Sequence, residues 1–117
     1  MVKNYARGYQ LEWKTKKMLE ANDWIAMRSP ASRSEADLIA MKGYHKLFVQ
    51  CKKTSKDNLY IYGLSDLLNL AKEHKAEPLL VYGFRYTPPF VLKITADKHK
   101  MKRSDDNLLF EEYLKKK

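Results

Sequence analysis

The sequence has very little cysteine and no long hydrophobic run. Its single cysteine, among 117 residues, excludes an internal disulfide and a cysteine-rich zinc site, and it suits a reducing compartment. No apolar stretch approaches the ~20 residues that span a bilayer, and the opening segment lacks the apolar region of a secretory signal. We therefore expect a cytoplasmic protein without a membrane segment.

Glycine, proline and histidine are also scarce, with four, four and three residues respectively. Neither repeats nor a flexible linker interrupt the chain, and the histidines lack metal-ligand spacing. A chain of this length suits one domain, so we predict a single domain over residues 1–117. The hydrophobic fraction of 44% is enough for one modest core.

Positive charge, in contrast, is abundant and unevenly distributed. Residues 1–56 contain 12 basic and 5 acidic side chains (+7), whereas residues 57–117 contain 11 and 9 (+2). Positive potential is therefore concentrated in the first half, as in a surface that binds a polyphosphate. This distribution favours a nucleic-acid partner over a merely basic, soluble protein.

Apolar periodicity predicts an α/β fold with a mixed sheet flanked by helices. The first helix is expected over residues 8–22, because Leu11, Thr15 and Leu19 fall on one face. A second helix is expected over about 65–74, where Ser65 or Asp66 can act as the N-cap.

Five strands and a last helix complete the predicted pattern. Asp105 or Asp106 is expected to cap the last helix, whose apolar stripe would consist of Leu108, Leu109, Tyr113 and Leu114. The strands are expected over residues 24–28, 36–41, 46–53, 78–84 and 90–94.

The strand over residues 46–53 carries the residues of greatest chemical interest. Because side chains alternate along a strand, Gln50 and Lys52 share one face. Asp37 lies in the preceding strand, and a hairpin that aligns the faces brings an acid, an amide and a lysine together. Asp37 and Gln50 offer oxygens to Mg²⁺, while Lys52 can orient or deprotonate a water or neutralise charge at phosphorus.

Glu12 on the first helix adds a second carboxylate. Residues 12 and 19 are seven positions apart, about 20° around the helix axis, so Glu12 lies at the edge of the apolar face. An acid at that edge needs a cation. The alternatives are a metal ion and an ion pair with Arg28 or a nearby lysine.

Asp37, twelve intervening residues and then Gln50-Cys51-Lys52 resemble the core motif of restriction-type nucleases. With Glu12, with Arg28 at the end of a strand, and with Arg7-Gly8 in the opening helix, the pattern resembles the archaeal-type Holliday junction resolvases over roughly residues 7–70. That resemblance implies a restriction-endonuclease-like core and a two-fold homodimer. It also implies a Mg²⁺-dependent enzyme, with Mn²⁺ as a substitute, that nicks opposite strands of a four-way DNA junction.

The resemblance also implies site residues. Glu12, Asp37 and Lys52 match catalytic positions, Gln50 completes the metal ligands, and Ser32 matches a loop serine near the scissile phosphate, with Ser29 or Ser34 as substitutes. We expect six cations to contact branched DNA, with Lys14 equally suited to a solvated surface, and so expect a nucleoid-associated protein. These cations are Arg7, Lys14, Arg28, Arg33, Lys53 and Lys56.

Gln50 departs from the family pattern, which has a glutamate at this position. Glutamine keeps a carbonyl oxygen but removes a negative charge, so metal affinity should fall. Three explanations follow: an active enzyme with a weaker metal site, a relative that only binds DNA, or a change introduced to arrest cleavage.

Three other functions compete with junction resolution. A nuclease of the same fold would cut linear duplex or other branched DNA. A DNA-binding protein without activity would bind junctions and never nick them. An RNA-binding module is the weakest of the three, because no RNA-recognition motif is present.

Overall fold

The computed structural model describes residues 2–29 and 36–117, with side chains from residue 10 onward in the first range. No helix in this part of the chain combines the length and the apolar character that a membrane crossing needs. In chain order the elements are α1 (Val2–Ala21), β1 (Ile25–Arg28), β2 (Leu38–Lys42), β3 (His45–Lys53), β4 (Asn58–Ile61), α2 (Ser65–Glu73), β5 (Glu77–Gly83), β6 (Phe90–Lys93), β7 (His99–Lys102), β8 (Leu108–Leu109) and α3 (Phe110–Lys115).

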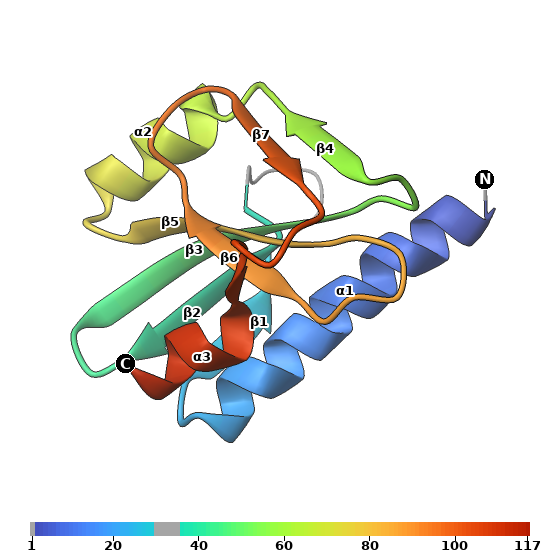
Figure 1. Cartoon of the computed structure of the whole chain (residues 1–117). Helices are drawn as coiled ribbons and strands as arrows, with labels where there is room; N and C mark the ends of the chain where they lie inside the picture. The colour runs from blue at the N-terminus through green and yellow to red at the C-terminus, as the bar shows by residue number, and fades with distance from the viewer. Residues whose placement is uncertain (1, 30–35) are drawn as a thin grey trace.

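Six strands form one mixed sheet in the order β1-β2-β3-β5-β6-β8 (Figure 1). Only β3 and β5 are parallel within it, and a parallel pair needs a long crossover, which β4 and α2 supply. Strands β4 and β7 pair separately as a two-stranded antiparallel sheet. This architecture confirms the predicted mixed sheet flanked by helices.

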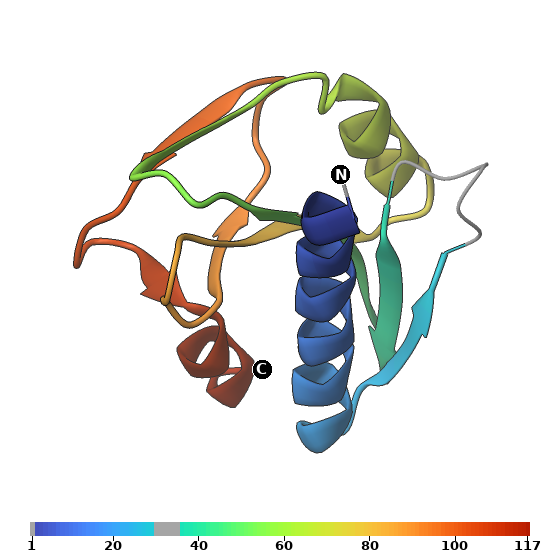
Figure 2. The same ribbon diagram turned by 90° about the vertical axis from the view of Figure 1, so that its right-hand side faces the viewer.

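The two faces of the sheet are covered by different elements. On β5, Leu79 and Val81 face one buried cluster, and Leu80 and Tyr82 face the other. Helices α1 and α3 cover the first face, and α2 with β4 and β7 covers the second (Figure 2). Because both its faces are buried, β5 has an almost continuous apolar sequence.

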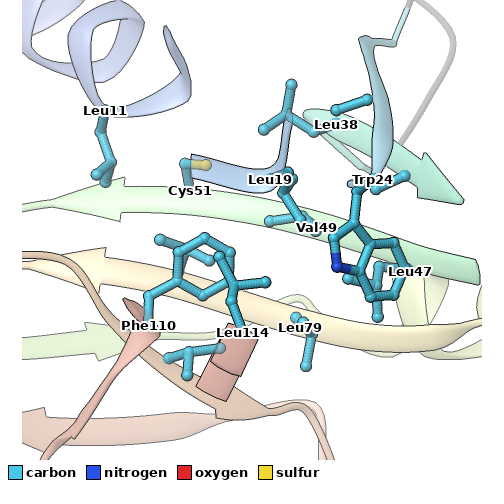
Figure 3. Packing of buried hydrophobic residues seen from close by; sticks show 14 residues of the cluster. Leu11, Leu19, Trp24, Leu38, Leu47, Val49, Cys51, Leu79, Phe110 and Leu114 are labelled. Atoms are coloured by element: carbon cyan, nitrogen blue, oxygen red, sulfur yellow. The ribbon is translucent and has the colours of Figure 1, made fainter. Parts of the chain in front are cut away.

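Helix α1 packs along β3 through residues spaced one turn apart. Leu11, Thr15 and Leu19 are buried, and Figure 3 shows the two leucines above Val49 and Cys51 of β3. The helix spans Val2–Ala21, so it begins six residues before the predicted start and ends one residue before the predicted end.

Beyond Ala21 the chain turns through Asp23, which has a φ of +71°. Left-handed residues commonly end helices in this way. The Asn22 side chain donates to the Met18 carbonyl at 2.9 Å and so satisfies one carbonyl of the last turn.

The predicted caps of the second and third helices are wrong. Leu64 is the residue before α2, and the Asp97 carboxylate accepts hydrogen bonds from the Ser65 N–H (2.9 Å) and hydroxyl (2.7 Å). Ser65 therefore donates its hydroxyl to a distant acid instead of capping its own helix. Neither Asp105 nor Asp106 caps α3, because the chain is extended through Leu109 before the helix begins.

The C-terminal region differs most from the sequence prediction. Leu108 and Leu109, which were expected on the last helix, form β8 instead and pair with Val91 and Phe90 of β6. Strands β4 and β7 were not predicted either. All three strands are short and depend on partners distant in the sequence, so local periodicity gives them little signal.

Candidate active site

Asp37 lies where the ladder between β2 and β3 ends. Its N–H donates to the Val49 carbonyl at 2.8 Å, although Leu38 is the residue paired opposite Val49. Two residues thus face one, as in a β-bulge, which redirects side chains. The Asp37 Oδ2 accepts a hydrogen bond from the Cys51 N–H at 2.8 Å. The carboxylate thus takes the place of the backbone carbonyl that a neighbouring strand would offer to this N–H.

Helix α1 carries Glu12 to the same point. The buried Thr15 packs against β3, with the Cys51 Sγ 3.7 Å from the Thr15 Oγ1. Glu12 lies one turn earlier on the helix, a spacing that places the two side chains near each other. Burial raises the pKa of Glu12, and the neighbouring Asp37 carboxylate raises that pKa further. The two acids are therefore close enough to interact electrostatically.

Arg28, the last residue of β1, holds Glu12 in place. Its Nε and Nη2 both lie 3.2 Å from the Glu12 Oε1. The ion pair with Arg28 foreseen as one alternative for Glu12 is thus present. Burial and Asp37 outweigh this ion pair, because the pKa of Glu12 stays above its ordinary value despite Arg28.

Lys52 and Gln50 approach from β3. Phe48 belongs to the cluster under α2, and Val49 and Cys51 belong to the cluster under α1, so the predicted alternation of β3 is confirmed. Burial raises the pKa of Asp37, while the Cys51 N–H and the positive charge of Lys52 pull it down. Lys52 therefore acts on Asp37 electrostatically, as an acid and a lysine in one site do.

Gln50 is half-buried, and within the described residues its amide has no hydrogen-bond partner. Two carboxylates with raised pKa values and an unpartnered amide are oxygen donors that fit a hard divalent cation. Within the same part of the chain, no cluster of three or more histidine, cysteine, aspartate or glutamate side chains is suited to a metal ion. If Gln50 joins Glu12 and Asp37, the site would offer two acids and an amide, where three acids would bind a cation more strongly.

The predicted DNA-contacting cations have different positions. Lys14 and Lys53 line one cavity of about 160 Å³ between α1 and the end of β5, and Lys56 is exposed in the loop after β3. Ser29, the substitute for the loop serine, donates its N–H to the Asp37 carbonyl at 3.0 Å. Ser32, Arg33, Ser34 and the side chain of Arg7 lie outside the described residues.

Arg85 and Tyr86 were not predicted as site residues, yet they lie beside Lys53. With Thr54 and Ser55, these three side chains line a cavity of about 370 Å³. The parallel register of β3 and β5, in which Lys53 pairs with Gly83, brings the two segments together. Their separation of more than thirty positions in the sequence hides this proximity.

Residues 3–115 match the sequence profile described as archaeal Holliday junction resolvase (hjc). The chain belongs to the archaeal Holliday junction resolvase family. Membership confirms the resemblance seen in the motifs, and it extends through the C-terminal strands, which contribute little to those motifs.

A solved structure of the resolvase Hjc from Archaeoglobus fulgidus, an archaeal hyperthermophile, has the same fold. It superposes with a TM-score of 0.75 and 19% sequence identity, covering 92% of this chain and 99% of that one. At this identity the likeness establishes the fold, while the site is argued from the residues of this chain.

Proposed function

We propose that this protein is a divalent-cation-dependent endonuclease that resolves four-way DNA junctions by paired nicks. The observation that carries the proposal is that Asp37 accepts a hydrogen bond from the Cys51 N–H beside Lys52 and interacts electrostatically with Glu12 and Lys52, in a chain of the resolvase family. The concentration of positive charge in residues 1–56 supports a DNA substrate.

Glu12, Asp37 and Gln50 would hold Mg²⁺, or Mn²⁺ in its place. A divalent cation bound there stabilises the negative charge that develops on the reacting phosphate. Lys52 orients the attacking water and adds positive charge beside the phosphate. Arg28 fixes the orientation of Glu12 through its guanidinium contacts at 3.2 Å.

The hydrolysis follows from in-line attack at phosphorus. The water oxygen forms a bond to phosphorus while the bond from phosphorus to the 3′ oxygen breaks. The proton from water ends on the departing oxygen through solvent, which leaves a 5′-phosphate and a 3′-hydroxyl. Glutamine at position 50 removes one negative charge from the site, so this enzyme should need more Mg²⁺ than one with a glutamate there.

A homodimer would match the two-fold symmetry of a four-way junction, whose two scissile strands are equivalent. The second face of the sheet has an apolar region that α2 leaves uncovered. Ile25, Met27 and Met41 lie there with exposed fractions of 64%, 45% and 38%. We assign the dimer contact to this surface, extended by α2, since exposed apolar patches mark association sites.

The experiment that tests the function compares synthetic four-way junctions, flaps and linear duplexes as substrates. The expected result is Mg²⁺-dependent nicking of opposing junction strands, with 5′-phosphate ends and little cutting of duplex. Equal cutting of linear duplex would refute junction resolution. Tight junction binding without nicking in Mg²⁺ or Mn²⁺ would leave a DNA-binding protein.

A further inference from the structure

The turn after β5 holds an aromatic residue in an unfavourable backbone conformation. The Thr87 N–H donates to the Phe84 carbonyl at 3.2 Å and closes a turn over residues 84–87. Tyr86, the third residue of that turn, has a φ of +64°. Turns of this kind favour glycine there, because a side chain at positive φ is strained.

Two other non-glycine residues of the described chain have positive φ, and both have an ordinary explanation. Asp23 follows α1 and Lys75 follows α2, where left-handed residues commonly end helices. Tyr86 ends no helix. A local rule broken without a structural gain is expected mainly at functional positions.

The turn is closed by hydrogen bonds and presents its side chains to solvent. The Thr87 hydroxyl accepts from the Phe84 N–H at 2.9 Å, and Pro88 and Pro89 follow directly. Tyr86 is 84% exposed, and its ring lies 5.0 Å from the guanidinium carbon of Arg85. An exposed ring stacked on a guanidinium and carried by a hydrogen-bonded turn is preorganised for a ligand.

Arg85 and Tyr86 form one side of a cationic groove. Together with Lys53, Thr54 and Ser55 they line the cavity of about 370 Å³, and Lys53 also lines the adjoining cavity with Lys14. Within the described residues, no acidic side chain lines either cavity and no ion pair involves Lys14, Lys53 or Arg85. The positive charge of this groove is thus left for an external anion.

The groove adjoins the active site through neighbouring residues of the chain. Leu11 and Lys53 line the groove, and Glu12 and Lys52 belong to the site. Consecutive Cα atoms are about 3.8 Å apart, so the groove and the site lie at the same end of β3, with the side chains of Lys53 and Lys52 on opposite faces of the strand.

We propose that Arg85 and Tyr86 form a subsite for the branch point of the junction, which rests on the function proposed above. Arg85 and Lys53 bind phosphates of the strand that leaves the site, and the Tyr86 ring stacks on a base exposed where the helices separate. A linear duplex offers no such base, so Tyr86 contributes to selectivity for branched DNA.

The first test is Tyr86→Asn, because asparagine tolerates positive φ and keeps the turn without the ring. Binding is measured by titrating labelled junction and labelled duplex in Ca²⁺. We expect about a tenfold loss of junction affinity, little change for duplex, and a melting temperature no lower than that of the wild type. The control is Tyr44→Asn, since Tyr44 is fully exposed in the turn at the other end of β3.

Two further measurements separate stacking from charge. A 2-aminopurine placed at the branch point should be quenched on binding wild-type protein and much less on binding Tyr86→Asn. Arg85→Ala should lower the slope of log affinity against log salt by about one.

The proposal is overturned if Tyr86→Asn binds and discriminates like the wild type while wild-type protein cleaves junctions. It is equally overturned if the loss is the same for duplex. If wild-type protein cleaves nothing, the proposed enzyme fails, whereas the binding and quenching results still decide the subsite.

Discussion

Lysines lie at both ends of β3, but only those at one end are held by hydrogen bonds among the described residues. Near its start, the Lys46 Nζ donates to the His74 carbonyl at 3.1 Å, and the Lys42 Nζ donates to the Asn22 carbonyl at 3.0 Å. Near its end, the side chains of Lys52 and Lys53 make no ion pair or hydrogen bond within the described residues. The first end uses its lysines to hold the fold, and the second leaves them for a polyanion.

The acids at the two ends differ in the same way. Near the start of β3, Glu77 accepts a hydrogen bond from the Tyr113 hydroxyl at 2.5 Å and lies 3.8 Å from the Lys93 ammonium. Near the end, burial and the neighbouring Asp37 carboxylate raise the pKa of Glu12, and burial raises that of Asp37. Glu12 and Asp37 are thus two neighbouring acids that favour a cation between them more strongly than Glu77 does.

The largest difference between the two ends is expected for a lysine pair. Lys52→Ala should reduce single-turnover nicking of a junction by about 10²–10⁴-fold, because the water loses its orienting group and the phosphate its neighbouring charge. Lys46→Ala, at the other end of the strand, should leave the rate within about twofold, with only a small loss of stability. Equal losses in both variants would erase the functional distinction between the ends.

Gln50→Glu should sharpen the contrast by adding a charge to the site. We expect the Mg²⁺ concentration for half-maximal nicking to fall by about tenfold, because ligand charge largely determines the affinity for this ion. The measurement is nicking rate against Mg²⁺ concentration for both proteins. An unchanged Mg²⁺ requirement would show that Gln50 does not contact the ion.

DNA affinity should separate the ends by a smaller factor. Lys53→Ala should weaken junction binding several-fold and lower the salt slope by about one, as expected for loss of one phosphate contact. Lys42→Ala should change neither quantity, because its ammonium is already bound to the Asn22 carbonyl. Titrations at several salt concentrations test this pair, and a parallel response of both variants would contradict it.

The raised pKa of Asp37 should also affect the stability of the fold. A carboxyl with a folded-state pKa above its unfolded value stabilises the fold below the unfolded pKa, and this contribution is lost as pH rises through the folded pKa. Asp37 has such a raised pKa, so it destabilises the fold at neutral pH. Asp37→Asn should therefore melt at a higher temperature than the wild type at neutral pH.

Melting curves across the acidic range check this prediction. The gain in melting temperature of Asp37→Asn over the wild type should shrink as pH falls and the Asp37 carboxyl protonates in both the folded and the unfolded protein. Added Mg²⁺ should raise the melting temperature of the wild type more than that of the variant, because a bound ion stabilises only the folded state. A variant less stable at every pH would contradict the assigned role.

The central elements of the fold were predictable from sequence because their burial is periodic. The strand expected over 46–53 is observed as His45–Lys53, and its alternation puts Gln50 and Lys52 on one face as expected. The short strands were not predictable. Strand β4, for example, has four residues and exists through its pairing with β7, about forty positions away.

The site was predictable to the extent that it depends on local geometry. Glu12 and Arg28 follow from helix and strand periodicity, and their pairing at 3.2 Å was one of the two expected outcomes. The bulge that directs Asp37 to the Cys51 N–H depends on where the ladder ends, which no local pattern records. Likewise, Arg85 and Tyr86 reach Lys53 only through the parallel register of β3 and β5.

The most direct test is the cleavage of a four-way junction by Asp37→Asn under single-turnover conditions in Mg²⁺, with binding measured on the same samples. The variant keeps a side-chain oxygen for the Cys51 N–H and removes one charge from the cation site. We predict wild-type nicking of opposing strands, at least a thousandfold slower nicking by the variant, and junction affinity within about threefold of the wild type. Undiminished nicking by a variant that binds equally well would contradict the assignment of the active site.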